Sequence, residues 1–241
     1  MESIHTLKFE NASLGYSEPI FGNINLNIQS PALVGLIGNN GRGKTTLLKT
    51  ISRLIPTKEG RVLFNGSNIT EFSQETISKF CSFCSAATPS LFPQRVFELV
   101  SLGRYPFINR FAKLSQNDEY KVLEVLDTFG LSKLKDNPIT QISDGERQKA
   151  WIAKAIVQDT PVLLFDEPTA FLDFGSKKRF FEIIRQHTLE KNKITIISSH
   201  DVGFLTAFAD YCWMIDDSNI IAGTTEEILK NPYFIKTFTH T

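Results

Sequence analysis

Short apolar runs alternate with stretches of helical periodicity along most of this chain. The apolar runs predict buried strands at residues 33–38, 162–165, 194–199, 211–216 and 219–223. Two stretches, 44–54 and 200–209, have patterns typical of helices. Because strands that alternate with helices form sheets of parallel neighbours, the pattern predicts an α/β fold whose sheet is parallel at its centre.

The middle of the chain has a different pattern. Residues 88–158 lack strand-like runs and are predicted to form a helical subdomain inserted into the α/β core, with 1–241 as one domain. The segment SQNDEYKVLEVLDTFG places four apolar side chains on one helix face: Val122, Val125, Leu126 and Phe129. Ser115 and Asp118 have the spacing of a capping box, and Gly130 is suited to end this helix.

The composition limits the possible functions. The 241 residues contain 26 Lys and Arg and 26 Asp and Glu, so a general nucleic-acid coat or a polybasic membrane tether is not expected. With 41% apolar residues the chain can bury a core. No run approaches the roughly 18 apolar residues of a spanning helix. The first residues lack the pattern of a secretion signal, so we expect the chain in the cytosol.

The three cysteines are too few for a disulfide framework. Cys81 and Cys84 form a lone C-x-x-C, whereas a structural zinc site needs a second Cys or His pair at matching spacing. The run CSFCS therefore predicts a buried strand rather than a metal site.

A glycine-rich loop follows the apolar run at 33–38 and precedes a predicted helix. It fits the pattern G-x-x-x-x-G-K-[ST] with Gly38, Asn39, Asn40, Gly41, Arg42, Gly43, Lys44 and Thr45. Backbone N–H groups of such a loop surround phosphate oxygens, and the helix that follows directs its positive end at the same anion. We expect Lys44 to reach the β- and γ-phosphates of ATP, the Thr45 hydroxyl to hold Mg²⁺, and Thr46 to belong to the ATP-binding set.

A second candidate element is VLLFDEP, in which an apolar run ends at two acids. Asp166 lies at the carboxyl end of the predicted strand, where α/β sheets bind ligands, and is suited to hold Mg²⁺ through water. Glu167 could polarise an attacking water. An exposed acidic turn has the same pattern, but the phosphate loop upstream favours the catalytic interpretation.

Further motifs carry a resemblance to a known family. Residues 142–150, ISDGERQKA, resemble the L-S-G-G-[QE]-R-[QR] signature of ATP-binding cassette ATPases, and DEPTAFLD at 166–173 resembles D-E-P-T-[SA]-x-L-D. Ser199-His200-Asp201 resembles the switch-histidine element of this family. The motifs keep the family's order over nearly the whole chain. The resemblance implies a P-loop NTPase fold with an inserted helical subdomain and an N-terminal antiparallel β region.

The same resemblance assigns roles to single residues. It implies that Tyr16 stacks on adenine and that His200 lies near the γ-phosphate. It also implies that ATP bound by one chain is contacted by the signature of another chain, in a head-to-tail homodimer. The residues expected on the signature side are Ser143, Gly145, Glu146 and Asp173. Ser143 and Glu146 also have capping-box spacing, so helix capping alone would explain them.

The stretch VFELVSLGRYP at 96–106 resembles importer ATPases for iron-siderophore, haem and cobalamin uptake. The resemblance implies docking on an integral-membrane permease, with an extracytoplasmic substrate-binding protein as an indirect partner. The chain would then be peripheral on the cytoplasmic face of the inner or plasma membrane. We expect Arg104 on the docking surface. Alternatives are a soluble cassette ATPase of DNA repair or translation, and the ATPase of an exporter or lipoprotein-release system. No nucleic-acid partner is expected.

Two departures from the family pattern concern the active site. Asp144 replaces the first signature glycine, and its charge is expected to oppose closure against a partner's γ-phosphate. Ala86 stands where the family has a glutamine that touches Mg²⁺ and the attacking water. The sequence therefore predicts a metal and water site that lacks one polar side chain.

Overall fold

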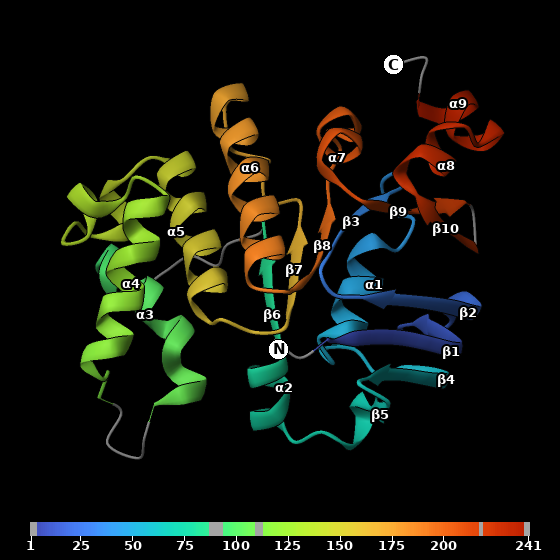
Figure 1. Cartoon of the computed structure of the whole chain (residues 1–241), viewed down its shortest axis with the longest axis horizontal. Helices are drawn as coiled ribbons and strands as arrows, with labels where there is room; N and C mark the ends of the chain where they lie inside the picture. Colours follow the sequence, from blue (N-terminus) through green and yellow to red (C-terminus); the bar gives the residue numbers. More distant parts are fainter. Residues whose placement is uncertain (1–3, 87–93, 109–112, 217–218, 239–241) are drawn as a thin grey trace.

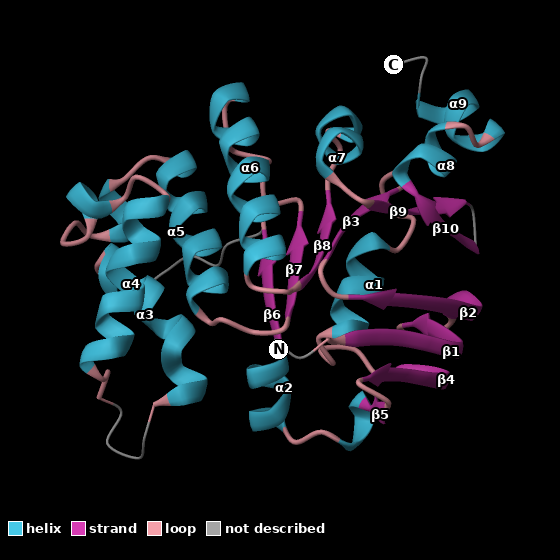
Figure 2. Ribbon diagram, viewed as in Figure 1, coloured by secondary structure: helices cyan, strands magenta, loops and turns pink. Residues whose placement is uncertain are grey.

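The computed structural model describes residues 4–86, 94–108, 113–216 and 219–238. Its described strands form two sheets (Figures 1 and 2). The four-stranded sheet is antiparallel, has the order β2-β1-β4-β5, and consists of β1 Thr6–Gly15, β2 Pro19–Gln29, β4 Thr57–Phe64 and β5 Ser67–Asn68. It is the N-terminal antiparallel region that the resemblance implied.

The six-stranded sheet contains all the strands that the apolar runs predicted. Its order is β10-β9-β3-β8-β7-β6, parallel except for the β10–β9 pair. The strands are β3 Ala32–Ile37, β6 Cys81–Ser85, β7 Val162–Asp166, β8 Ile194–Ser198, β9 Tyr211–Asp216 and β10 Asn219–Thr224. The predicted α/β architecture with a parallel centre is confirmed.

Helices cover both faces of this sheet. Helix α1, Lys44–Ile51, lies between the two sheets, and its Leu47, Leu48 and Ile51 join a core with residues of both (Figure 1). The opposite face carries α5, α6, α7, α8 and α9, with bounds Asp144–Val157, Phe174–Glu190, Val202–Phe208, Thr225–Leu229 and Pro232–Phe238. No helix of the described residues is long and apolar enough to cross a membrane.

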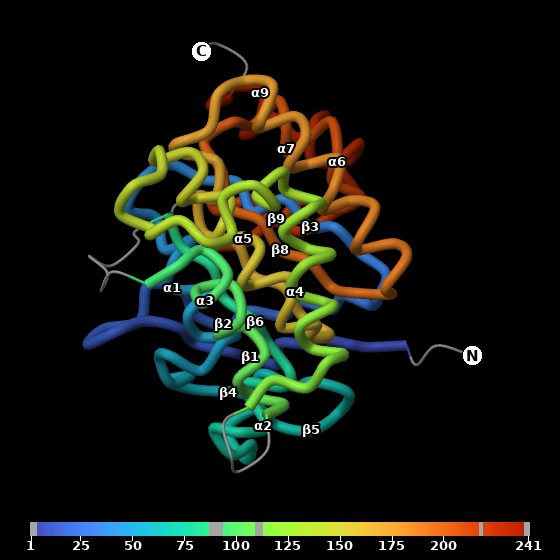
Figure 3. The backbone as a smooth tube through the Cα atoms, turned by 90° about the vertical axis from the view of Figure 1, so that its left-hand side faces the viewer, coloured from blue at the N-terminus to red at the C-terminus, as the bar shows by residue number. Residues whose placement is uncertain are grey.

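The predicted helical subdomain forms a layer on one side of the parallel sheet, seen face-on in Figure 3. It consists of α3 Val96–Ser101, the 3-10 helix η2 Leu102–Phe107, α4 Gln116–Thr128 and α5. Its expected lower bound at residue 88 lies outside the described residues. The Ser115–Asp118 capping box of α4 is confirmed, and Gly130 follows the helix with a φ of +68°. Val122 and Leu126 are fully buried on the predicted face.

Several boundaries differ from the predicted ones. The helix expected over 44–54 ends at Ile51, before Arg53 at a φ of +56°. The helix expected over 200–209 begins at Val202. Helix α2, Gln74–Phe80, was not predicted, because its seven residues are too few to show a clear periodicity. Short 3-10 turns also occur at Ile69–Glu71, Ser132–Leu134 and Ile139–Gln141.

Strand β6 contains both residues of the C-x-x-C pair. Cys81 packs into the core around α1, whereas Cys84 packs into the core around α5 and α6. The two thiols therefore lie on opposite faces of the sheet. Burial raises the pKa of both thiols, that of Cys84 to about 12. Both are structural residues of a buried strand, as the sequence predicted.

Candidate functional site

The phosphate loop joins β3 to α1, and two of its glycines adopt positive φ angles. Gly41 has a φ of +74° and Gly43, which precedes α1, a φ of +94°. A Cβ on Gly43 would lie 2.6 Å from the Phe21 ring, so packing as well as conformation requires glycine there. No side chain caps the start of α1. Its first N–H groups can therefore bind an anion.

Lys44 is held against the loop that precedes it. Its side chain is buried, and Nζ donates hydrogen bonds to the carbonyl oxygens of Gly38 at 2.6 Å and Asn39 at 3.4 Å. Burial lowers the pKa of Lys44, whereas the nearby Glu167 and Asp166 carboxylates raise it. The ammonium is thus a partly desolvated cation, which favours a strong interaction with a phosphate.

A polar chain connects α1 to the ends of two neighbouring strands. Thr45 Oγ1 donates to Asp166 Oδ2 at 2.6 Å, and Ser198 Oγ donates to Asp166 Oδ1 at 2.7 Å. Hydroxyl and carboxylate oxygens are the ligand atoms that Mg²⁺ prefers. The arrangement of Thr45 and Asp166 therefore fits the metal site that the sequence predicted.

Glu167 has an unusual backbone, with a φ of +53°. Its N–H donates to the backbone oxygen and to Oγ of Ser198, both at 3.1 Å, and these bonds hold the residue in this conformation. The His200 N–H donates to Glu167 Oε2 at 3.1 Å. Glu167 therefore connects the ends of β7 and β8.

The other carboxylate oxygen, Oε1 of Glu167, is buried and accepts no hydrogen bond from the described residues. It lies 3.2 Å from His200 Nε2 and 3.9 Å from Lys44 Nζ. A buried acceptor without a donor is costly unless a ligand or water satisfies it. Oε1 is thus suited to accept a proton from a water bound beside it.

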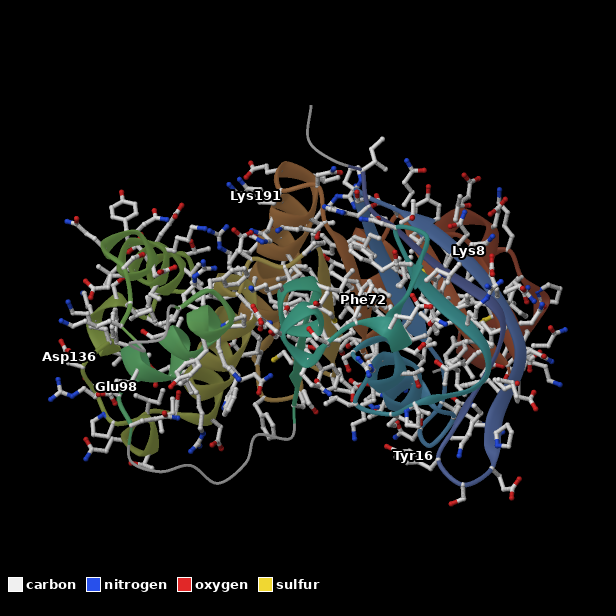
Figure 4. The ribbon with its side chains drawn as sticks, turned by 90° about the horizontal axis from the view of Figure 1, so that it is seen from below. Lys8, Tyr16, Phe72, Glu98, Asp136 and Lys191 are labelled. Carbon is white, nitrogen blue, oxygen red and sulfur yellow. The ribbon has the colours of Figure 1, made fainter. Side chains whose placement is uncertain are left out.

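These elements surround an open cavity of about 290 Å³. Its lining consists of Tyr16, Ile20, Asn39, Asn40, Gly41, Gly43, Lys44, Thr45, Thr46, Asp166, Glu167 and His200. Tyr16 is exposed on the turn between β1 and β2 (Figure 4). The predicted phosphate, metal, base and adenine residues are therefore brought together. Gly38 and Arg42 belong to the same loop, and Gly38 is the acceptor for Lys44.

The signature residues form a separate group. Ser143 precedes α5 and Asp173 precedes α6, and each side chain accepts a hydrogen bond from the start of its helix. Gly145 packs against the segment before Asp173, because its Cβ position lies 3.3 Å from the Phe171 carbonyl oxygen. None of the predicted signature residues, among those described, lines the cavity of Lys44.

Within this group the capping box is fully formed. Ser143 Oγ donates to Glu146 Oε2 at 2.7 Å and accepts from the Glu146 N–H at 3.3 Å. The hydrogen bond from the Ser143 hydroxyl is the largest cause that lowers the pKa of Glu146. In this chain alone, Ser143 and Glu146 therefore act as helix-capping residues, and a phosphate at Ser143 would compete with Glu146 for its hydroxyl.

Asp144 is paired with Arg147, whose Nη2 donates to Asp144 Oδ1. From the sequence alone, the negative charge of Asp144 was expected to oppose closure against a partner's γ-phosphate. The Arg147 guanidinium, three residues further along the helix, offsets part of this charge.

The expectation that Arg104 lies on a docking surface was wrong. Arg104 is 5% exposed, with Nε donating to Asp118 at 2.8 Å and Nη1 to the Val157 carbonyl at 2.9 Å. It ties η2 to α4 and α5. The neighbouring Gly103 is equally constrained, because a Cβ there would lie 2.3 Å from the Lys154 carbonyl oxygen.

Reversing the charge at Arg104 would test folding, since breaking a buried pair costs about 3–5 kcal/mol.

Two residues that shape the site, Phe21 and Ser198, were not predicted from the sequence. Phe21 packs against the Gly43 turn, and only the folded β2 reveals this contact. Ser198 binds both acids of the DEP motif. Ser198 could have been found from the sequence, because it is a polar residue at the end of an apolar strand. Parallel strands end at the same edge of the sheet, so such a residue is expected beside Asp166. At Ala86, where the family glutamine was expected, the N–H donates to the Asp166 carbonyl at 2.9 Å.

A parallel sheet with a lysine-bearing phosphate loop, an Asp at the end of a neighbouring strand and a glutamate beside it defines a P-loop nucleoside triphosphatase. Residues 21–170 match the ABC transporter family. The chain belongs to this family, as an ATP-binding subunit with ATPase activity.

Individual relatives agree with this placement. The achromobactin transport ATP-binding protein of Dickeya dadantii is 34% identical over 219 residues, which cover 90% of this chain and 81% of the relative. The ferric enterobactin transport ATP-binding protein of Escherichia coli is 31% identical over 232 residues, covering 95% and 85%. A solved ABC transporter in an inward-facing conformation, described as of the metal-chelate type, superposes with a TM-score of 0.83 at 25% identity, covering 98% of this chain and 89% of that one.

Proposed function

We propose that this chain is the ATP-hydrolysing subunit of a metal-chelate importer, with an iron-siderophore, haem or cobalamin as the cargo. The relatives named for achromobactin and ferric enterobactin transport support the cargo class. The arrangement around Glu167, whose buried Oε1 accepts no hydrogen bond from the described residues, carries the proposed chemistry. The subunit would lie on the cytoplasmic face of the membrane, bound through its permease.

The cavity residues have complementary roles in this proposal. Lys44 and the first N–H groups of α1 bind the β- and γ-phosphates, and Tyr16 covers the adenine. Thr45 and Asp166 would hold Mg²⁺, which when bound offsets the charge of these phosphates. Glu167 Oε1 accepts the proton of the water that attacks the γ-phosphate. The His200 backbone N–H holds the carboxylate in position through Oε2, and its imidazole, with Nε2 3.2 Å from Oε1, contacts the γ-phosphate.

Two copies are needed to complete each site. Ser143, Gly145, Glu146 and Asp173 form the second group, away from the cavity of the same chain. Ser143 lies at the start of the 14-residue helix α5, where N–H groups favour an anion. We propose that this helix start contacts the γ-phosphate bound by a second copy, so that ATP joins two chains head to tail and hydrolysis releases them.

The permease is proposed to dock on η2, through side chains that are exposed in the chain alone. Tyr105 is 61% exposed, and Leu102 and Phe107 are also partly exposed. Arg104 supports this surface from below, with its guanidinium carbon 4.4 Å from the Phe107 ring centre. Aromatic side chains of this kind contribute strongly to protein interfaces.

Changing Tyr105 to Glu tests the docking surface. We expect permease co-purification to fall by about 10-fold, because a carboxylate replaces an aromatic interface residue, while the ATPase activity of the free subunit stays unchanged. Tyr120→Glu is the matched control, since Tyr120 is also exposed on the helical layer but lies on α4. Co-purification of Tyr105→Glu at the level of the control would remove η2 as the docking element. A wild-type chain that captures no membrane subunit at all would overturn the proposed docking on a permease.

A further inference from the structure

The strand β6 brings one more polar side chain to the edge of the sheet at which the metal site lies. Ser85 is paired with Asp166 of β7, and Asp166 is paired with Ser198 of β8, in continuous parallel register. Residues in register on neighbouring parallel strands project to the same face of a sheet. Ser85, Asp166 and Ser198 therefore form a polar row across three strand ends.

The packing of the three strands identifies which face this is. Cys81 and Phe83 of β6 pack with Leu164 and Ile196 in the core around α1. Cys84 packs in the core on the opposite face, with Phe165 and Ile197. The alternation continues to Ser85, which belongs to the α1 face. Asp166 is on that face as well, because Thr45 of α1 donates to it.

We propose that Ser85 is a positioning residue of the Mg²⁺ site, in place of the glutamine missing at Ala86. Its hydroxyl holds a water of the metal's hydration shell next to Asp166, as Ser198 binds Asp166 directly from the other side. The register is secured by the Ala86 N–H, which donates to the Asp166 carbonyl, while the Ala86 methyl group cannot bind water. This inference rests on the proposed ATP and Mg²⁺ binding.

The test compares the Mg²⁺ dependence of nucleotide binding in two serine variants. A non-hydrolysable ATP analogue is titrated at rising Mg²⁺ concentrations and, separately, in EDTA. Ser85→Ala should raise the Mg²⁺ concentration at half-maximal binding by about 3- to 10-fold, the effect of one hydrogen bond to a metal-bound water. Affinity in EDTA should stay within about 2-fold, because the phosphate contacts are intact. Ser85→Thr should restore the Mg²⁺ dependence by restoring the hydroxyl.

Ser82→Ala is the matched control on the same strand. Ser82 is buried, its Oγ has no hydrogen-bond partner among the described residues, and it alternates with Ser85 to the opposite face. The Ser82→Ala variant should bind Mg²⁺ and nucleotide as the wild type does. A Ser85→Ala curve that matches the Ser82→Ala curve would overturn the role of Ser85 and leave the proposed function standing. A wild-type chain without Mg²⁺-dependent binding would instead overturn the proposed function.

Discussion

Replacing Glu167 by glutamine will lower ATP turnover by about 10²- to 10⁴-fold and leave ATP binding close to that of the wild type. The amide keeps the size of the side chain, but it cannot accept the proton of the attacking water. The proton acceptor that is lost is Oε1, which is available to a water because it accepts no hydrogen bond from the described residues. Phosphate release and equilibrium nucleotide binding, measured on the same preparation, separate the two effects.

Glu182→Gln is the control for this substitution. Glu182 lies on α6, interacts with Arg179 at the surface and does not line the cavity. The Glu182→Gln variant should hydrolyse ATP at the wild-type rate. If Glu167→Gln retained more than a tenth of wild-type turnover, another group would have to take the proton, and Glu167 would be a structural link between β7 and β8.

Replacing Lys44 by alanine will weaken ATP binding by about 10²-fold, because the phosphates lose a charge-assisted hydrogen-bond donor. The fold should survive. The buried ammonium is a desolvated cation whose pKa is lowered by burial, so its removal offsets the loss of its bonds to Gly38 and Asn39. Nucleotide titration and chemical unfolding of the nucleotide-free chain measure the two quantities.

Lys49→Ala, on the last turn of the same helix, is the control for Lys44→Ala. It removes a cation from α1 without touching the phosphate loop, so ATP affinity should not change. Equal affinities of the two variants would show that Lys44 stays bound to its own loop when nucleotide is present, and that the N–H groups of α1 alone hold the phosphates.

The sequence predicted most of the cavity, because its parts are continuous motifs at strand ends. The phosphate loop, Asp166 and Glu167 each follow an apolar run, and parallel strands bring such ends to one edge of the sheet. The local sequence pattern and the geometry of a parallel sheet were therefore sufficient to predict that these residues lie together.

What was not predicted from the sequence concerns side chains whose neighbours are set by folding, either within a helix or between distant segments. Arg104 was expected to be exposed because it is charged. It is buried instead, because Asp118 and the Val157 carbonyl accept hydrogen bonds from its guanidinium. The alternation that places Ser85 beside Asp166 depends on the pairing of β6 with β7, which the sequence does not specify. Asp144 has its partner Arg147 only three residues away, but helix formation is needed to bring them together.

In the proposed dimer, each ATP is bound between the cavity of one chain and the signature group of another. Sedimentation of Glu167→Gln with ATP tests it, combined with either Ser143→Ala or Ser115→Ala. Both serines cap a helix in a complete capping box, so both changes weaken a helix start similarly, by about 1 kcal/mol. We expect Glu167→Gln to sediment as a dimer with ATP and Ser115→Ala to preserve this dimer. Ser143→Ala should weaken it by about 10-fold while each monomer still binds ATP. A dimer equally strong in both serine variants, or an ATP-bound Glu167→Gln chain that remains monomeric, would contradict the shared site.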